Sequence, residues 1–360
     1  MAFQLVRLDE DSLYEHIFER YVELERHTAT LKQDLGIQQR DASTLEIDIE
    51  PPEPSDEVVR VKKSGRRRRK GDRPSEDEGA RTYDERYSVV VEQSLSDLNS
   101  SVSNNNSTTG YVLWSSTPFF LRWLLYSAEA QPFRNGNVAV EVEGASEDTI
   151  IVPGMYSGAQ GDVGILELGT GISPLLASVL CNHVSGYVCT DQRGILNKLK
   201  QNLRENVSQI TRRRCVSASL GIENEPEGAI SDELEEPSRT RRKPTVRLEV
   251  QELDWEKFSA DAPHPYLDQL ADGCETVYIM AMDVIYNEYL IGPFLRTLSA
   301  LRDLFGKKQT RVRCLVGVHL RSQDIATRFL EQAVVEYELP VHSIRGTAVD
   351  QSRYALYLVN

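Results

Sequence analysis

The segment Ile165-Leu-Glu-Leu-Gly-Thr-Gly-Ile-Ser-Pro-Leu-Leu-Ala177 is the most informative part of this chain about its fold. Its apolar beginning predicts a buried strand, and its glycines predict a tight turn that opens directly into a helix. Gly169 and Gly171 allow turn dihedrals and the close approach of a ligand to the backbone. Ser173 and Pro174 suit the cap and the first position of the helix. We therefore expect the turn to present free backbone N–H groups to a bound cofactor.

A second apolar run, Gly186-Tyr-Val-Cys-Thr190, delivers Asp191 at its end. A carboxylate at this place in a βαβ unit can accept hydrogen bonds from both hydroxyls of a ribose. The glycine turn and Asp191 together therefore predict an adenosine site. The alternative interpretation is a tight turn followed by a helix-capping Asp.

The choice of cofactor depends on two features of the glycine motif. A dinucleotide fingerprint has a third glycine at the position where this chain has Pro174. Glu167 adds a carboxylate that faces the same cleft, and a sulfonium-bearing ligand tolerates this charge better than a pyrophosphate does. We therefore predict S-adenosyl-L-methionine as the cofactor; NAD and the absence of any cofactor are the alternatives.

Beyond Gly164 the chain alternates short β-branched runs with helical segments, which is the pattern of βαβ units. We expect an α/β fold with a Rossmann-like seven-stranded core. Strands are expected at residues 164–168, 186–190, 246–250, 277–282, 313–318, 333–339 and 354–359. Helices are expected at residues 174–182, 194–207, 289–305 and 322–332.

The composition divides the chain into four parts. Residues 1–50 form an N-terminal extension with a helix at 9–35, and residues 51–85 form a linker whose basic block, 62–70, predicts disorder. In residues 86–160 we expect a strand at 87–93, a loop at 100–109, a helix capped by Thr117 with Pro118 at its first position, and a hairpin of 138–142 with 149–152. Residues 161–360 form the core domain, in which the acidic segment at about 212–243 predicts a disordered insertion.

Charge and cysteine content narrow the class of protein. The formal net charge is −14, which disfavours non-specific binding to a polyphosphate and suits a basic macromolecular partner. Five cysteines without a C-x-x-C pair are typical of buried thiols, and six scattered histidines predict no metal site. The chain shows no signal peptide and no membrane span, so we expect a cytoplasmic protein. We also expect it to be a monomer. The block at residues 66–70 could be a nuclear signal, an RNA-binding tail or a solvated charge run.

Four motifs together resemble methyltransferase family 16, a class I family of protein-lysine methyltransferases. The motifs are Glu167-Leu-Gly-Thr-Gly171, Leu253-Asp-Trp255, Asp283-Val-Ile-Tyr286 and Gly110-Tyr-Val-Leu-Trp-Ser-Ser116. The resemblance covers roughly residues 87–360. It implies that Trp114 covers S-adenosyl-L-methionine, that Gly169, Thr170 and Gly171 hold its methionine part, and that Asp191 binds its ribose. It also implies that Trp255 packs on the adenine and that Met282 lines the same pocket.

The resemblance places Asp283 and Tyr286 at the methyl acceptor. Both follow the fourth core strand, beside the switch point at which α/β folds bind ligands. A lysine must arrive as a neutral amine, because an ammonium has no lone pair with which to attack a sulfonium methyl. The carboxylate and the phenol can hydrogen-bond the amine or the adjacent substrate backbone. The alternative interpretation is a helix-capping Asp and a core Tyr.

Two observations disfavour a nucleic acid as the acceptor. Nucleic-acid amine methyltransferases carry Pro-Pro-Tyr or Pro-Pro-Phe here to stack a flipped base, whereas this chain has Val284-Ile285 before Tyr286. The acidic balance disfavours direct binding to nucleic acid as well. We therefore predict S-adenosyl-L-methionine-dependent N-methylation of a lysine on a basic protein, with ribosomal proteins as candidates. The rival hypotheses are a catalytically silent binding protein of the same fold and a methyltransferase that acts on a small molecule or nucleic acid.

Overall fold

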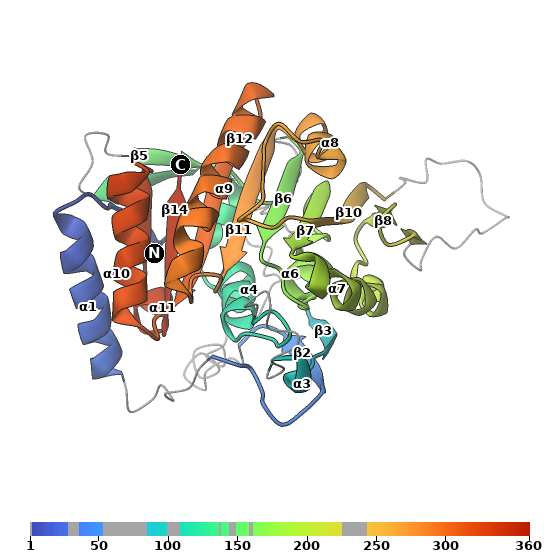
Figure 1. The fold of residues 1–360 in the computed structure, drawn as a ribbon, viewed down its shortest axis with the longest axis horizontal. Coiled ribbons are helices and arrows are strands. Elements are labelled where there is room, and N and C mark those ends of the chain that lie inside the picture. Colours follow the sequence, from blue (N-terminus) through green and yellow to red (C-terminus); the bar gives the residue numbers. More distant parts are fainter. Residues whose placement is uncertain are drawn as a thin grey trace, which may run out of the picture.

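The structure is a computed structural model that describes residues 2–27, 36–52, 85–98, 109–136, 138–143, 149–157, 161–224 and 243–360. One large sheet runs through these residues, and helices cover both of its faces (Figure 1). The fold is therefore of the α/β class, as predicted.

Seven strands form the centre of the sheet. They are β6 (Val163–Leu168), β7 (Gly186–Asp191), β10 (Thr245–Glu252), β11 (Thr276–Met282), β12 (Arg311–His319), β13 (Val341–Arg345) and β14 (Tyr354–Val359). Their order is β13-β14-β12-β11-β6-β7-β10. Six of these strands run in one direction, and β14 runs in the opposite direction. The prediction of a Rossmann-like seven-stranded core is confirmed. The strand order reverses at β6, so the carboxyl end of β6 is the switch point at which such sheets bind ligands.

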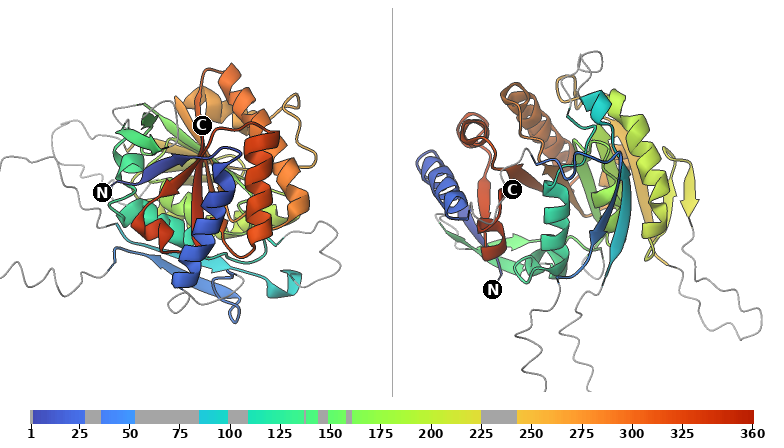
Figure 2. Two further views of the ribbon diagram at one scale, coloured as in Figure 1. Left: turned by 90° about the vertical axis from the view of Figure 1, so that its left-hand side faces the viewer. Right: turned by 90° about the horizontal axis from the view of Figure 1, so that it is seen from below.

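Five further strands extend this core at its two edges. Beyond β10 lie β8 (Arg214–Ser217) and β9 (Ile222–Asn224), and beyond β13 lie β1 (Gln4–Arg7), β4 (Val138–Glu143) and β5 (Thr149–Val152). The predicted hairpin of β4 and β5 is confirmed. The strand β1 was not predicted; it pairs antiparallel with β13, so the N-terminal residues lie beside the C-terminal strands (Figure 2).

Two hydrophobic cores lie on the two faces of the sheet. One core contains residues of α4 (Ser116–Tyr126), α5 (Gln131–Asn135), α6 (Leu175–Leu180) and α7 (Arg193–Glu205); the other contains residues of α1 (Ser12–Arg26), α8 (Pro265–Gly273), α9 (Glu288–Lys307) and α10 (Gln323–Glu331). The strand β6 sends Ile165 into the first core and Leu166 into the second. A strand that is buried on both faces has one continuous apolar run in its sequence, and for this reason β6 could be predicted. Among the described helices, none is both long and apolar enough to cross a membrane.

The N-terminal helix α1 is tied to the C-terminal part of the chain. The Arg20 side chain is 1% exposed, and its guanidinium donates hydrogen bonds to the carbonyl oxygens of Val349, Asp350 and Tyr354. Two of these carbonyls belong to α11 (Thr347–Asp350). The helix predicted at residues 9–35 is confirmed as far as Arg26, and residues 28–35 lie outside the described residues.

A small two-stranded sheet lies outside the large one. It consists of β2 (Thr44–Ile49), which was not predicted, and β3 (Tyr87–Glu92), which was. The side-chain amides of Asn202 on α7 and of Asn206, the residue that caps this helix, hydrogen-bond the backbone of β3 on its other edge. In Figure 1 this sheet, the short helix α3 (Leu95–Leu98) and α4 lie beyond the carboxyl end of β11. These elements therefore close the edge of the large sheet at which a ligand would bind.

Four predictions about the secondary structure are wrong. The helix α6 begins at Leu175 with Pro174 at its cap, so Ser173 and Pro174 each lie one position before the place predicted for them. Residues 333–339 do not form a strand, because α10 continues through the π-helical turn η3 (Gln332–Glu336), which buries Ala333, and β13 begins only after Pro340. The helix α4 begins at Ser116, so Thr117 lies within it rather than at its cap. The predicted insertion is ordered in its first part, where Arg214–Ser217 and Ile222–Asn224 are the strands β8 and β9. Residues 53–84, 99–108 and 225–242, to which the other predictions of disorder or loop apply, lie outside the described residues.

Candidate active site

The glycine turn joins β6 to α6 at the switch point. Gly169 and Gly171 have φ values of 68° and 62°, which is the left-handed region that favours glycine. A Cβ on Gly169 would lie 2.7 Å from Val284 Cγ1 and 3.2 Å from a ring carbon of Trp255. Backbone conformation and lack of space therefore both require glycine at position 169.

The N–H groups of the turn are already used within the protein, which corrects the expectation that they are free. Thr170 N donates to the Thr190 carbonyl oxygen at 3.0 Å, Gly171 N to Asp191 Oδ2 at 2.7 Å, and Ile172 N to the Gly110 carbonyl oxygen at 2.9 Å. These bonds arise because β7 and the segment at Gly110 pack directly against the turn. The turn is therefore held in one shape by its neighbours, and Gly169 and Gly171 line the pocket without side chains.

Asp191 ends β7 and faces the glycine turn. Its Oδ2 accepts from Gly171 N and its Oδ1 from Gln192 N, both at 2.7 Å. Burial raises the pKa of this carboxyl to about 6, against the lowering effect of the two backbone hydrogen bonds. Each carboxylate oxygen can accept a further hydrogen bond. Asp191 can therefore hold the turn and bind a hydroxyl of a ligand at the same time.

Glu167 lies in the same pocket and is 4% exposed. Its Oε2 accepts from the Tyr187 hydroxyl at 2.6 Å. Burial, together with the neighbouring Asp191 charge, raises the pKa of Glu167 to about 8, against the lowering effect of hydrogen bonds with Tyr187 and Thr170. This carboxyl is therefore largely protonated at neutral pH until a cation approaches it.

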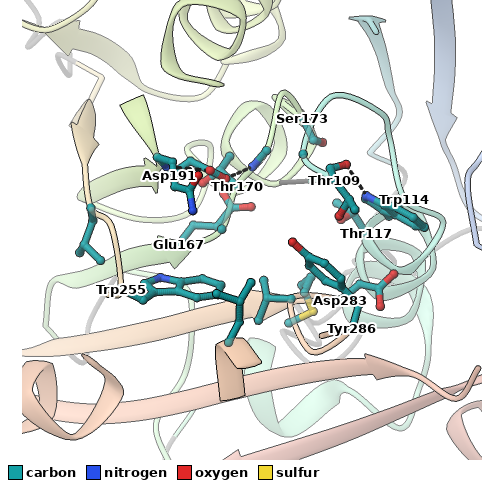
Figure 3. A pocket seen from close by; sticks show the side chains of 18 of the residues that line it. Thr109, Trp114, Thr117, Glu167, Thr170, Ser173, Asp191, Trp255, Asp283 and Tyr286 are labelled. Atoms are coloured by element: carbon teal, nitrogen blue, oxygen red, sulfur yellow. Dashed lines mark hydrogen bonds between the residues drawn. The ribbon is translucent and has the colours of Figure 1, made fainter. Parts of the chain in front are cut away.

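One pocket, with about 800 Å³ of empty space counted out to its open mouth, contains every residue predicted for the site. Figure 3 shows Trp255 and Trp114 on opposite sides of this pocket. We call the side lined by Glu167, Gly169, Thr170, Gly171, Asp191 and Trp255 the glycine-turn end. We call the side lined by Thr109, Trp114, Asp283 and Tyr286 the Trp114 end.

Trp255 follows β10 and forms a half-buried wall of the glycine-turn end. Its ring packs edge-on against Phe294 of α9, with ring centroids 5.3 Å apart. Met282 is the last residue of β11 and is 8% exposed at the pocket. Both residues line the pocket where the sequence placed them.

Asp283 and Tyr286 follow β11 at the Trp114 end. Asp283 has a φ of 61°, and its N–H donates to the Gly317 carbonyl oxygen of β12 at 2.7 Å. Burial raises the pKa of Asp283 to about 6, although its ion pair with Arg321 lowers it. The pKa of the half-buried Tyr286 is raised mainly by burial, against the lowering effect of hydrogen bonds with Thr109. Neither residue has the helix-cap or core position that the alternative interpretation gave it, since the cap of α9 is Asn287.

Trp114 closes the pocket at its other side. Its Nε1 donates to the Thr109 carbonyl oxygen at 3.2 Å, and its backbone forms a β-bridge with Ile37 of the N-terminal extension. Next to it, Ser115 N donates to the Gly36 carbonyl oxygen at 2.8 Å. The N-terminal extension, which carries none of the motifs, therefore supports this side of the pocket.

The structure adds Arg321, which sequence reasoning missed. Arg321 follows β12, and its guanidinium pairs with the Asp283 carboxylate and lies 4.7 Å from the centroid of the Trp114 ring. The available signal was its place just after a core strand that neighbours β11, since parallel strands that pair side by side end at the same edge. The sequence also contains no sign that Thr109 lines the pocket, because Thr109 ends a polar tract that is typical of a loop.

The fold and the pocket define a class I methyltransferase, in which a glycine turn and a following carboxylate meet at the switch point of a seven-stranded sheet. The whole chain aligns with ribosomal lysine N-methyltransferase 5 of Saccharomyces cerevisiae strains AWRI796, RM11-1a and S288c. Each alignment is 47% identical over 371 residues and covers 100% of both chains. The chain belongs to this family of lysine N-methyltransferases, and the predicted protein-lysine methyltransferase class is confirmed.

The other comparisons are weaker. No protein-family model matches the chain. Among solved structures, a human methyltransferase 10 domain containing protein has a TM-score of 0.29 and 13% identity, covering 55% of this chain and 70% of that one. A putative O-methyltransferase from Nostoc punctiforme has a TM-score of 0.29 and 8% identity, covering 54% of this chain and 50% of that one.

Proposed function

We propose that this protein binds S-adenosyl-L-methionine in the pocket between Trp255 and Trp114 and methylates a lysine of a ribosomal protein. The observation that carries the proposal is that a single pocket joins the glycine-turn end to the Trp114 end. A donor held at the first end and an acceptor entering at the second would therefore meet within one cavity. Such positioning supplies a large part of the rate of a bimolecular transfer.

The glycine-turn end has the groups needed to hold the donor, which supplies an electrophilic methyl group on a sulfonium when it is bound. Asp191 has acceptor capacity left for the ribose hydroxyls. Trp255 offers a flat apolar wall for the adenine, and Gly169 and Gly171 line the pocket with backbone alone, beside the place proposed for the methionine part. Glu167 can lose its proton when a cationic ligand approaches, because a nearby positive charge favours the carboxylate. The pocket thus favours a ligand that is polar at one end and cationic at the other.

The Trp114 end has the groups needed to orient a lysine. Because burial raises the pKa of Tyr286, its hydroxyl keeps its proton at neutral pH and acts by hydrogen bonding rather than as a general base. In the reaction the amine nitrogen forms a bond to the methyl carbon, the carbon–sulfur bond breaks, and the amine later loses a proton to solvent. The protein's contribution at this end is orientation of the amine by Tyr286, beside the buried carboxylate of Asp283.

The proposal of a ribosomal protein as substrate has two supports. The relatives carry the name ribosomal lysine N-methyltransferase 5, and a net charge of −14 attracts a basic partner. The test incubates the purified protein with tritiated donor and ribosomal subunits from a strain that lacks its own copy. We expect one labelled ribosomal protein with methyl-lysine by mass spectrometry. The matched control is the Asp191→Ala variant, which should leave the band unlabelled at limiting donor. Label on RNA, or no label on any protein, would contradict the proposal.

A further inference from the structure

Arg321 occupies a place between the two groups that define the Trp114 end. It follows the end of β12, which pairs in parallel with β11, so Arg321 and Asp283 emerge at the same edge of the sheet. Its guanidinium forms an ion pair with the Asp283 carboxylate and lies over the Trp114 ring, 4.7 Å from the centroid. The Arg321 side chain therefore connects Asp283 with Trp114.

The ion pair matters because the Asp283 side chain is 1% exposed. A buried carboxylate without a partner is costly, so it would attract whichever cation can reach it. An incoming lysine is such a cation, and an unpaired carboxylate would favour its charged ammonium form. The charged form cannot accept a methyl group, since it has no lone pair. An anion left open at this place would therefore work against the reaction.

We propose that Arg321 is a positioning residue for the methyl acceptor: it holds the Asp283 carboxylate in an ion pair, so the incoming lysine meets no open anion that would keep it protonated. The stacking on Trp114 fixes the guanidinium, and the positive charge itself favours a neutral neighbour. This inference rests on the proposed function, because it requires a lysine acceptor at the Trp114 end.

Other titratable groups surround this place. They are Asp283 and Tyr286 after β11, His319 at the end of β12, Tyr354 at the start of β14, and Glu167 and Asp191 at the glycine-turn end. The carboxyl groups Asp283 and Asp191 have pKa values of about 6, and Glu167 has one of about 8. A bound donor brings a positive charge to the glycine-turn end, which favours the ionised form of Glu167 throughout this pH range. With saturating donor, the rising limb of the pH–rate profile therefore reports the acceptor amine.

The test measures single-turnover methylation between pH 6.5 and 10 with saturating donor and saturating acceptor, so that the profile reports the bound complex. The acceptor is the ribosomal protein labelled above. In Arg321→Gln we expect the rising limb of the pH–rate profile to shift to higher pH by about one unit or more. The rate should be about 10-fold lower than that of wild type at pH 7.5 and should approach the wild-type rate at pH 10. Arg321→Lys retains the charge, so its limb should stay near the wild-type position while its rate falls, because lysine lacks the planar fork and the stacking. Arg328→Gln changes an exposed arginine of α10 and should match wild type.

A second readout does not depend on turnover. With S-adenosylhomocysteine in place of the donor, calorimetry of acceptor binding at pH 8 in buffers of different ionisation enthalpy counts the protons released. We expect close to one proton per lysine in the wild-type protein and clearly fewer in Arg321→Gln. An unchanged limb and unchanged proton release in a folded Arg321→Gln protein would overturn the inference. If the wild-type protein methylated no lysine at all, the proposed function would fail instead, and the two failures are thus distinguishable.

Discussion

The glycine-turn end and the Trp114 end of the pocket are built in different ways. Apart from Trp255, the glycine-turn end comes from residues 167–191, a single strand–turn–helix–strand unit. The Trp114 end combines residues from four separate segments: 36–37, 109–115, 283–286 and 321. The first end is shaped by backbone hydrogen bonds around a turn, and the second by backbone and side-chain contacts between segments far apart in sequence.

This difference indicates a division of labour. A common cofactor can be held by a local unit that many sequences can form, because its recognition depends on backbone shape and one carboxylate. An acceptor that differs between enzymes requires a surface that can vary, and separate segments can change independently. We therefore expect substitutions at the glycine-turn end to change donor binding and substitutions at the Trp114 end to change turnover.

The largest effect is expected for Asp191→Ala. The variant removes acceptors for the ribose and for Gly171 N, so donor affinity should fall by roughly 1.5–3 kcal/mol, the scale of hydrogen bonds to a charged group. Isothermal titration of the folded variant measures the change. Asp272→Ala, which removes a carboxylate that is 70% exposed on α8, is the matched control and should bind donor like wild type. Wild-type affinity in Asp191→Ala would remove the ribose assignment.

The next effect concerns the Trp114 end. Tyr286→Phe should lower single-turnover methylation by about 10-fold, while donor affinity changes less, because the lost hydroxyl belongs to the Trp114 end, where we propose that the acceptor enters. Tyr289→Phe is the control, since it removes the hydroxyl of a neighbouring tyrosine that is 80% exposed. If Tyr286→Phe methylates at the wild-type rate, Tyr286 is a packing residue and the division of labour fails at this position.

A smaller effect should appear in the pH dependence of stability. The pKa of Glu167 is about 8 in the folded protein, whereas an ordinary glutamate, as in the unfolded chain, has a pKa of 4.5. Between these two pH values the folded state therefore retains a proton that the unfolded state has lost. The stability from this group is complete below pH 4.5 and is lost as the pH rises through 8. Without donor, wild type should lose on the order of 1–2 kcal/mol more than Glu167→Gln between pH 6.5 and 8.5. Thermal unfolding at both pH values measures this difference. Glu275→Gln, an exposed control, should retain the wild-type dependence, and an equal loss in Glu167→Gln would disprove the raised pKa.

The smallest effect is expected for deletion of residues 226–241. The ends to be joined, after β9 and before β10, lie at the same edge of the sheet because Asn224 and Thr245 pair with Cys215 and Arg214 of β8. They are two strand spacings apart, roughly 10 Å, which four residues can span. Loop shortening changes stability by only about 0.6 kcal/mol per halving of length. Differential scanning fluorimetry should show a small shift in Tm and unchanged donor affinity. A large loss of either would show that the segment belongs to the core or to the site.

Prediction from sequence succeeded where the signal was local. The core strands carry continuous apolar runs because both of their faces are buried. The glycine turn could be predicted because Gly169 and Gly171 adopt a backbone conformation that favours glycine. It failed at residues 333–339, where Val334 and Val335 favour a strand but the helix continues to the turn before Pro340. It also placed the start of the insertion too early, since the short strands β8 and β9 carry little periodicity.

The class of fold, the glycine-turn end and the kind of cofactor could be predicted from the sequence, because a strand, a turn and the next strand's carboxylate are set by residues close together in the chain. Three other features could be found only in the folded protein. The tertiary structure brought Arg321 to Asp283 and Trp114, it placed residues 36–37 behind Trp114, and it used the N–H groups of the turn for internal hydrogen bonds. The physical reason is that these contacts depend on how separate elements pack, and no local pattern in the chain encodes the distance between them.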